Sequence, residues 1–281
     1  MPATPTPDVP PATELRDLAV SVAREAAALL EDALHRPRES VSTKSSGTDM
    51  VTEMDAASER LLVDRISAAR PEDAIVGEEG ADRSGTTGVR WVIDPLDGTT
   101  NYLYRLPGWN VSIGVEVEDR PVAGAVLVPG FRDEFAAAED AGATRNGEQL
   151  LLGGSAPLAE ALVGTGFSYD REQRRVQAAQ VTALIADVRD VRRIGAAATD
   201  LCGVACGRLD AFYETGLAAW DRSAGTIIAR EAGARVEVVA GNRLDGVLTL
   251  ACHPALWGDF TALLARAGVL ADGDAPAEPV A

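Results

Sequence analysis

The feature that most constrains this chain is an apolar run that ends in two closely spaced acids. Residues 91–102 read WVIDPLDGTTNY, so a strand-like segment delivers Asp94, and Asp97 follows three residues later. Carboxylates that lie together at the end of a buried strand repel one another and lose their hydration. We therefore expect the fold to place positive charge beside Asp94 and Asp97.

Three further acids lie in a similar local setting. Glu78 and Glu79 follow the short apolar segment 74–76, and Asp221 follows Trp220. A single acid in a loop is usually just solvated, but five acids at apparent strand ends or turns favour a shared role. A divalent cation would relieve their repulsion, and all-oxygen ligands without histidine or cysteine favour Mg2+ or Mn2+ over zinc. Because Mg2+ readily shares phosphate oxygens, the pattern indicates a phosphate-ester site.

The residues that follow Asp97 suit an anionic ligand. Gly98, Thr99 and Thr100 can begin a helix, whose unpaired N–H groups and dipole favour an anion. Alone, this segment would be interpreted as an ordinary helix cap. Beside the acids we prefer a phosphate-binding turn, in which Gly98 permits close approach of the backbone. Such a site supports attack on the ester by metal-activated water, without a covalent intermediate.

Composition limits the class of protein. The 281 residues include 43 acids and 26 bases, and this net charge of −17 disfavours unaided binding to nucleic acid or to an anionic membrane. No apolar run reaches the roughly 20 residues that span a membrane, and the first dozen residues do not resemble a signal peptide. Three cysteines and two histidines give little support to disulfides or zinc, so we expect a cytoplasmic protein.

Hydrophobic periodicity predicts an α+β protein with two layered halves. Apolar residues three or four apart indicate helices over 13–34 and 52–69, with a polar loop or hairpin at 41–52. A strand over 89–93 ends at Asp94, an antiparallel meander follows to residue 144, and strands then alternate with helices. The predicted divisions are a disordered N-terminal tail (1–12), an α+β half with the acidic motifs (13–153), an α/β half (154–270) and a disordered C-terminal tail (271–281).

These motifs resemble those of the inositol monophosphatase family, in particular its bacterial inositol-1-monophosphatases. The likeness covers residues 13–267, and it implies a layered αβαβα sandwich as the fold. The segments that carry it are Lys44-Ser45-Ser46 with Asp49, Val51-Thr52 and Asp55; Gly77-Glu78-Glu79; residues 94–101; Gly195-Ala196-Ala197; Tyr213-Glu214; and Trp220-Asp221.

The resemblance implies an active site with two or three Mg2+ ions, for which Mn2+ is a possible substitute. A first ion would bind Glu78, Asp94 and the carbonyl group of Leu96. A second ion would bind Asp94, Asp97 and Asp221. A weaker third ion would use Glu78 and water.

The resemblance also implies how water and substrate are bound. Glu79 and Thr99 would align the attacking water, with Asp55 behind Thr99. The amides of Gly98 and Thr99 would hold the phosphate. The residues that would bind sugar hydroxyls are Gly195, Ala196, Ala197 and Glu214.

Several residues depart from the family pattern or have more than one interpretation. Ala196 stands where a hydroxyl residue is common, which predicts one sugar contact fewer. Arg222 either turns outward, which we prefer, or reaches an additional phosphate and so favours bisphosphates. Lys44 is either a surface lysine or steers the substrate phosphate, and Asp49 is a possible site residue of the same segment.

The resulting hypothesis is a Mg2+-dependent, lithium-sensitive phosphatase of myo-inositol monophosphate. Glu214 favours a polyol as the leaving alcohol, and the resemblance suggests a homodimer. The net charge argues against nucleic acid and membrane partners. Histidinol phosphate is the main alternative substrate, followed by a bisphosphate nucleotide or fructose 1,6-bisphosphate. A regulatory or binding protein without catalysis is the alternative of another class, but every predicted metal ligand is an intact acid.

Overall fold

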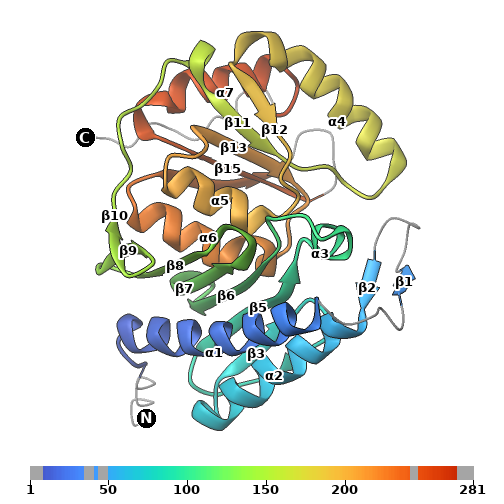
Figure 1. Ribbon diagram of the computed structural model, residues 1–281. Helices are drawn as coiled ribbons and strands as arrows, with labels where there is room; N and C mark the ends of the chain where they lie inside the picture. The colour runs from blue at the N-terminus through green and yellow to red at the C-terminus, as the bar shows by residue number, and fades with distance from the viewer. Residues whose placement is uncertain (1–8, 35–40, 44–49, 241–245, 271–281) are drawn as a thin grey trace, which may run out of the picture.

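The computed structural model describes residues 9–34, 41–43, 50–240 and 246–270. Two β-sheets alternate with three layers of helices to form a five-layer αβαβα sandwich (Figure 1). This confirms the predicted fold class. The predicted tails lie largely, and Lys44 and Asp49 entirely, outside the described residues.

The first sheet contains eight strands, and all of its neighbouring pairs are antiparallel except β3 with β5. The predicted meander forms its centre, and Asn146 and Gly147 both have positive φ at the tight turn between the last two strands. The strands are β3 (Ala74–Gly77), β4 (Asp82–Arg83), β5 (Val89–Asp97), β6 (Asn110–Val117), β7 (Arg120–Val128), β8 (Asp133–Ala138), β9 (Gly142–Arg145) and β10 (Glu148–Leu150).

Two amphipathic helices, α1 (Ala12–Ala33) and α2 (Glu53–Ala69), cover the outer face of this sheet (Figure 1). The buried side of α1 repeats every three or four residues, as the sequence predicted, and includes Leu15, Val22 and Leu30. A short antiparallel pair, β1 (Val41–Thr43) and β2 (Met50–Thr52), precedes α2, in agreement with the predicted hairpin.

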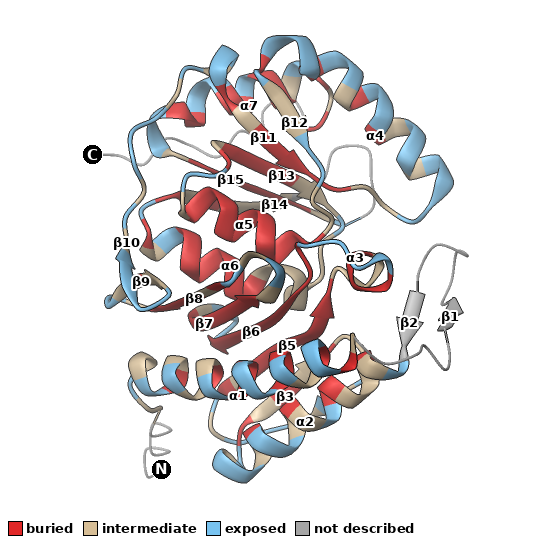
Figure 2. Cartoon of the chain, in the orientation of Figure 1, coloured by how far each residue is buried: buried red, intermediate tan, exposed pale blue. Residues whose placement is uncertain are grey.

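The second sheet has five strands in the order β12-β11-β13-β15-β14. Helices α4 (Arg171–Leu184) and α7 (Trp257–Arg266) cover its outer side, and α5 (Ala197–Ala205) and α6 (Ala219–Glu231) lie between the two sheets (Figure 1). Every residue of α5 is buried, as the red colour of this layer shows (Figure 2). The strands are β11 (Leu162–Thr165), β12 (Asp190–Arg192), β13 (Ala211–Thr215), β14 (Arg235–Ala240) and β15 (Val247–Cys252).

Two of the acidic residues lie in different elements from those predicted. Strand β5 does not end at Asp94 but continues to Asp97, with an irregular register between them. Asp221 was expected at a strand end or turn, but it lies in the first turn of α6. In both cases the prediction was wrong because buried acids that accept backbone hydrogen bonds fit inside regular elements.

Two glycines of the central strands allow α6 to approach the first sheet closely. A β-carbon at Gly114 of β6 would lie 2.4 Å from Ser223 Oγ, and one at Gly124 of β7 would lie 2.9 Å from the α-carbon of Ala224. Ser223 is two residues after Asp221. This close packing therefore sets the position of an acid that belongs to the predicted site.

We expect Gly114→Ala to lower the free energy of unfolding by about 1–3 kcal/mol, because the added methyl group overlaps α6. Urea denaturation measures the change. Gly153→Ala is the matched control, since a β-carbon there meets no atom within 4 Å, and it should leave stability within about 0.5 kcal/mol. Equal effects of the two substitutions would contradict the proposed helix contact.

Candidate active site

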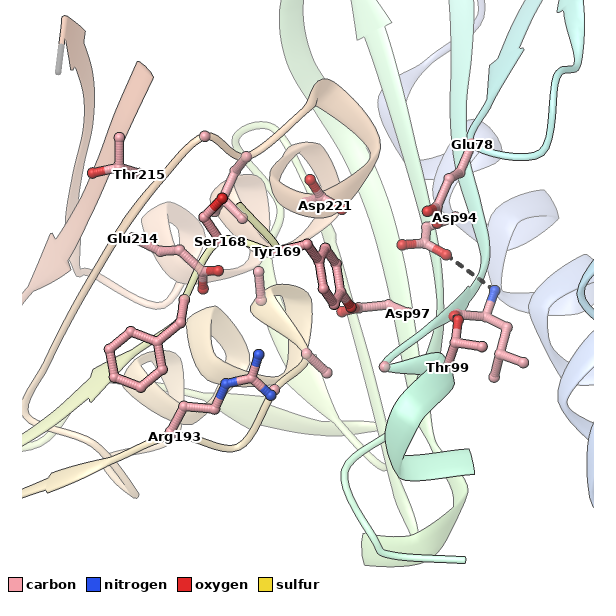
Figure 3. Close-up of a pocket in the computed structure, with 18 of the residues that line it drawn as sticks. Glu78, Asp94, Asp97, Thr99, Ser168, Tyr169, Arg193, Glu214, Thr215 and Asp221 are labelled. Atoms are coloured by element: carbon pink, nitrogen blue, oxygen red, sulfur yellow. Dashed lines mark hydrogen bonds between the residues drawn. The ribbon is translucent and has the colours of Figure 1, made fainter. Parts of the chain in front are cut away.

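Most of the predicted site residues line one pocket of about 380 Å³ between the two halves of the sandwich. The first half contributes residues at the ends of β3 and β5, and the second contributes the starts of α5 and α6 and the end of β13. Figure 3 shows Glu78 and Asp94 on one wall and Glu214 and Arg193 on the opposite wall. The predicted residues that line the pocket are Glu78, Asp94, Leu96, Asp97, Gly98, Thr99, Gly195, Ala196, Ala197, Glu214 and Asp221.

Three aspartates of the pocket share one arrangement, in which the protein holds one carboxylate oxygen. Asp94 Oδ1 accepts the N–H of Leu96 at 3.0 Å, and Asp221 Oδ2 accepts the N–H of Ala218 at 2.6 Å. Asp97 Oδ2 accepts from Asn110 Nδ2 at 2.8 Å and from the N–H of Ala198 at 3.1 Å. These bonds orient the three side chains.

The second oxygen of each aspartate makes no hydrogen bond within the described part of the chain. A carboxylate with one oxygen held by the protein and one available is the usual arrangement of a metal ligand. The donor set contains only oxygen, so it suits Mg2+. Among the described residues, no three acidic, histidine or cysteine side chains are yet grouped as ligands of a single ion. The carboxylates would therefore have to move together around a cation.

Electrostatic repulsion among these carboxylates is strong. Burial, and the neighbouring charges of Glu78, Asp97 and Asp221, raise the pKa of Asp94 well above its ordinary value. Burial, followed by the charge of Asp97, does the same to the pKa of Asp221. Burial raises the pKa of Asp97 to about 6, although the hydrogen bonds from Asn110 and Ala198 oppose this rise. The site thus favours any ligand that adds positive charge.

The helices that border the pocket supply part of that charge. Residues in the first turns of α3 (Thr99–Tyr104), α5 and α6 line the pocket, so three helix N-termini meet there. The positive end of a helix dipole stabilises nearby anions. Gly98, which precedes α3, has φ +83°, and a β-carbon there would lie 3.1 Å from that of Ala196. Glycine is thus required for this turn to fit against the second half of the molecule.

Helix α2 holds three segments of the site through side chains on one face. Asp55 Oδ2 lies 3.4 Å from Thr99 Oγ1, which also lies 3.2 Å from the carbonyl oxygen of Leu96. Ser58 Oγ donates to the carbonyl oxygen of Pro95 at 2.9 Å. The contact between Asp55 and Thr99 agrees with the arrangement that the resemblance implied, in which Asp55 lies behind Thr99.

Glu59, the next residue of α2, was not identified from the sequence. It is only 8% exposed, and its two oxygens accept the N–H groups of Glu79 and Ala81 at 2.9 and 3.1 Å. A β-carbon at Gly77 would lie 2.3 Å from Glu59 Oε2. Glu59 therefore holds the loop that presents Glu78. Glu79 itself does not line the pocket.

Glu214 forms the opposite wall of the pocket. A β-carbon at Gly166 would lie 1.9 Å from Glu214 Oε1, so only glycine at this position leaves room for the carboxylate. Burial raises the pKa of Glu214 to about 7; the charge of Arg193 opposes the rise and that of Asp97 adds to it. An acid with this pKa can accept or donate a hydrogen bond near neutral pH.

The sequence prediction missed part of the pocket wall. The segment directly after β12 contributes Arg193, the one basic side chain among the described residues that line the pocket. Its signal in the sequence was its place directly before Ile194-Gly195. By contrast, Arg222 is half-buried in the first turn of α6 and does not line the pocket. Other residues that were missed are Phe167, Ser168, Tyr169, Gln173, Thr215, Gly216 and Leu217.

This arrangement of acids at a pocket between two sheets agrees with comparisons with known proteins. The model of the inositol monophosphatase family matches residues 12–269, so the chain belongs to that family. The chain is 43% identical to the inositol-1-monophosphatase of Mycobacterium bovis, over 92% of this chain and 96% of that protein. It is also 37% identical to the Nus factor SuhB of Escherichia coli, over 80% of this chain and 85% of that protein.

Solved structures support the same assignment. The structure of Mycobacterium tuberculosis SuhB superposes with a TM-score of 0.80 at 41% identity, covering 93% of this chain and all of that one. Inositol monophosphatase from Anabaena superposes with a TM-score of 0.78 at 32% identity, covering 92% and 98%. Membership of this family supports a phosphatase. The relatives carry two different names, inositol-1-monophosphatase and Nus factor, so their names alone do not define one specific activity.

We expect Glu59→Gln to loosen the loop after β3, because the new amide group turns an N–H donor toward the N–H of Glu79 or Ala81. A buried donor without a partner costs about 1–3 kcal/mol. Hydrogen exchange at the amides of Glu79 and Ala81 should accelerate at least roughly fivefold, the equivalent of about 1 kcal/mol.

Glu53→Gln makes the same chemical change at an exposed position of the same helix. Exchange at Glu79 and Ala81 should not change in this control. Unchanged exchange at both amides in Glu59→Gln would show that Glu59 does not hold the loop.

Proposed function

We propose that this chain is a Mg2+-dependent phosphomonoesterase that hydrolyses myo-inositol monophosphate to myo-inositol and phosphate. The observation that carries the proposal is the set of three aspartates, each with one oxygen fixed by the protein and one available. Such a set is suited to divalent cations and, through them, to a phosphate group.

The residues that would hold the cations are Glu78, Asp94, Asp97, Asp221 and the carbonyl group of Leu96. When bound, Mg2+ supplies the Lewis acidity that activates water and neutralises charge on the phosphate oxygens. The contacts to Leu96, Ala218, Asn110 and Ala198 hold one oxygen of each aspartate, so only the other oxygen of each carboxylate would have to turn toward a cation.

The chain's own groups would orient the water and the phosphate. Thr99 donates its hydroxyl proton to Asp55 or to the Leu96 carbonyl oxygen, so its own oxygen can accept a hydrogen bond from the attacking water. Glu79 would assist if the loop held by Glu59 brings its carboxylate toward the pocket. The backbone N–H groups of Gly98 and Thr99 would contact the phosphate.

The alcohol would leave toward Glu214 and the segment 195–197. The carboxylate of Glu214 can accept hydrogen bonds from vicinal hydroxyl groups, which favours a polyol. Ala196 offers no hydroxyl group, so this chain relies on backbone groups there. Lys44 and Asp49 lie outside the described residues and stay predictions, and Arg222 does not line the pocket.

The substrate is tested by phosphate release with Mg2+ from four esters: inositol 1-phosphate, histidinol phosphate, fructose 1,6-bisphosphate and 3′-phosphoadenosine 5′-phosphate. We expect the highest kcat/KM for inositol 1-phosphate, and inhibition by lithium as in the family. If inositol 1-phosphate is among the poorest of the four, the substrate assignment fails. Release from none of the esters, together with tight binding of a macromolecule, would favour a regulatory protein instead.

Asp94→Asn tests the metal site through activity and stability together. Loss of the charge should lower kcat with inositol 1-phosphate by more than about a hundredfold, because electrostatic stabilisation of phosphoryl transfer depends on it. The same substitution removes a repelled buried carboxylate. Because the pKa of Asp94 is raised in the folded protein, folding binds a proton there, and stability falls as pH rises from the unfolded value through the folded value.

Without metal, wild-type Tm should therefore fall between pH 5 and pH 8, and the Tm of Asp94→Asn should fall less. Added Mg2+ should raise wild-type Tm more at pH 8 than at pH 5, since its ligands must be deprotonated. The variant should gain little at either pH. Near-normal turnover in Asp94→Asn, or an equal Mg2+ effect on both proteins, would overturn the metal assignment.

Location and oligomeric state are separate from the chemistry of the site. Among the described residues, no helix is long and apolar enough to cross a membrane. A cytoplasmic location stays a prediction from the cysteine content. A homodimer stays a prediction from the resemblance, and light scattering can check it.

A further inference from the structure

Arg193 occupies a fixed place at the alcohol side of the pocket. Its guanidinium lies over Gly195, where a β-carbon would be 2.2 Å from Nη1. The carbonyl oxygen of Gly195 lies 3.3 Å from the β-carbon position of Gly98, in the proposed phosphate-binding turn. Gly195 therefore lies against both the guanidinium of Arg193 and that turn.

The segment that carries Arg193 is tied to the acidic motif. Asn101 Nδ2, in α3, donates to the carbonyl oxygen of Ile194 at 2.9 Å. This bond crosses from the first half of the molecule to the second. It fixes the backbone next to Arg193 relative to the residues that would hold the phosphate.

The donors of Arg193 are available to a ligand. Within the described residues, its guanidinium makes no hydrogen bond or ion pair, although its charge lowers the pKa of Glu214 and of Asp97 against the larger effect of burial. Figure 3 shows the guanidinium directed into the pocket, on the same side as Glu214. The preceding residue differs: Arg192 pairs with Asp190 at 2.6 Å and does not line the pocket.

The alcohol side of the pocket thus combines a donor-only cation with a carboxylate. Without Arg193, the carboxylates of this pocket would attract a positively charged alcohol. Arg193 opposes that attraction at the place where the leaving group lies. A neutral polyol can use both groups, because its hydroxyl oxygens accept from Arg193 and its hydroxyl protons reach Glu214.

We propose that Arg193 is a specificity-determining residue that selects against leaving alcohols with a positive charge and in favour of neutral or anionic ones. This inference rests on the proposed phosphomonoesterase function. It predicts poor use of amino-alcohol phosphates, including the alternative substrate histidinol phosphate. It also assigns to Arg193 the recognition of an additional anionic group, a role that is the less preferred of the two interpretations of Arg222 from sequence.

The test uses three esters of similar size whose leaving alcohols differ in charge: serinol phosphate (cationic), glycerol 3-phosphate (neutral) and 3-phosphoglycerate (anionic). The measured quantity is the ratio of kcat/KM for the cationic ester to that for the anionic ester. Arg193→Gln should raise this ratio roughly tenfold, as expected for a unit charge nearby after screening. Arg193→Glu should raise it further, and Arg193→Lys should keep it within about threefold of wild type.

Arg192→Gln is the matched control, because it changes the net charge equally and lies one residue away. Its ratio should stay within about twofold of wild type. An unchanged ratio in Arg193→Gln, or an equal change in Arg192→Gln, would overturn the proposal. Circular dichroism of each variant, with Arg193→Lys as the conservative replacement, separates specificity from misfolding.

A binding experiment distinguishes failure of the proposed function from failure of the role proposed for Arg193. If the wild-type protein releases phosphate from none of the esters, their binding with Mg2+ is measured by calorimetry in the same variants. Weaker binding of the cationic than the anionic ester, with the difference reduced in Arg193→Gln and kept in Arg192→Gln, would support Arg193 even so. No dependence of binding on Arg193 would reject it.

Discussion

The structure depends on the way in which it holds aspartates that repel one another. Asp94, Asp97 and Asp221 come from both halves of the sandwich, and each gives one oxygen to a donor of the protein. The donor to Asp97 from α5 belongs to the second half, so that carboxylate is fully held only when the two halves have packed. Assembly of the fold and assembly of the site are therefore one event.

Repulsion among the aspartates explains why three helix N-termini lie at the same pocket. The N-termini of α3, α5 and α6 meet the carboxylates, and Gly98 and Gly114 let the backbones come close enough for this. Helix dipoles offset only part of the negative charge. The remaining negative charge is what the proposed Mg2+ ions, and through them a phosphate group, would neutralise.

Much of the fold and of the site's acidic half could be predicted from the sequence, because it depends on short segments. The apolar run before Asp94 and the helical spacing in α1 are local patterns. Glu59 and Arg193 gave no comparable signal, since Glu59 looks like an ordinary helix residue and Arg193 like a loop cation. Glu59 holds a loop 20 residues away, and the segment of Arg193 is held through Ile194 by a residue 93 positions away; no local pattern encodes either contact.

The contact between Gly166 and Glu214 has a consequence for how specificity can change in this fold. The missing side chain at position 166 is what makes space for the carboxylate. A methyl group added at position 166 would displace the carboxylate of Glu214. It would leave the acids on the opposite wall of the pocket unchanged. Under the proposed function, a change at residue 166 would therefore alter recognition of the alcohol and leave the residues that would hold the cations unchanged.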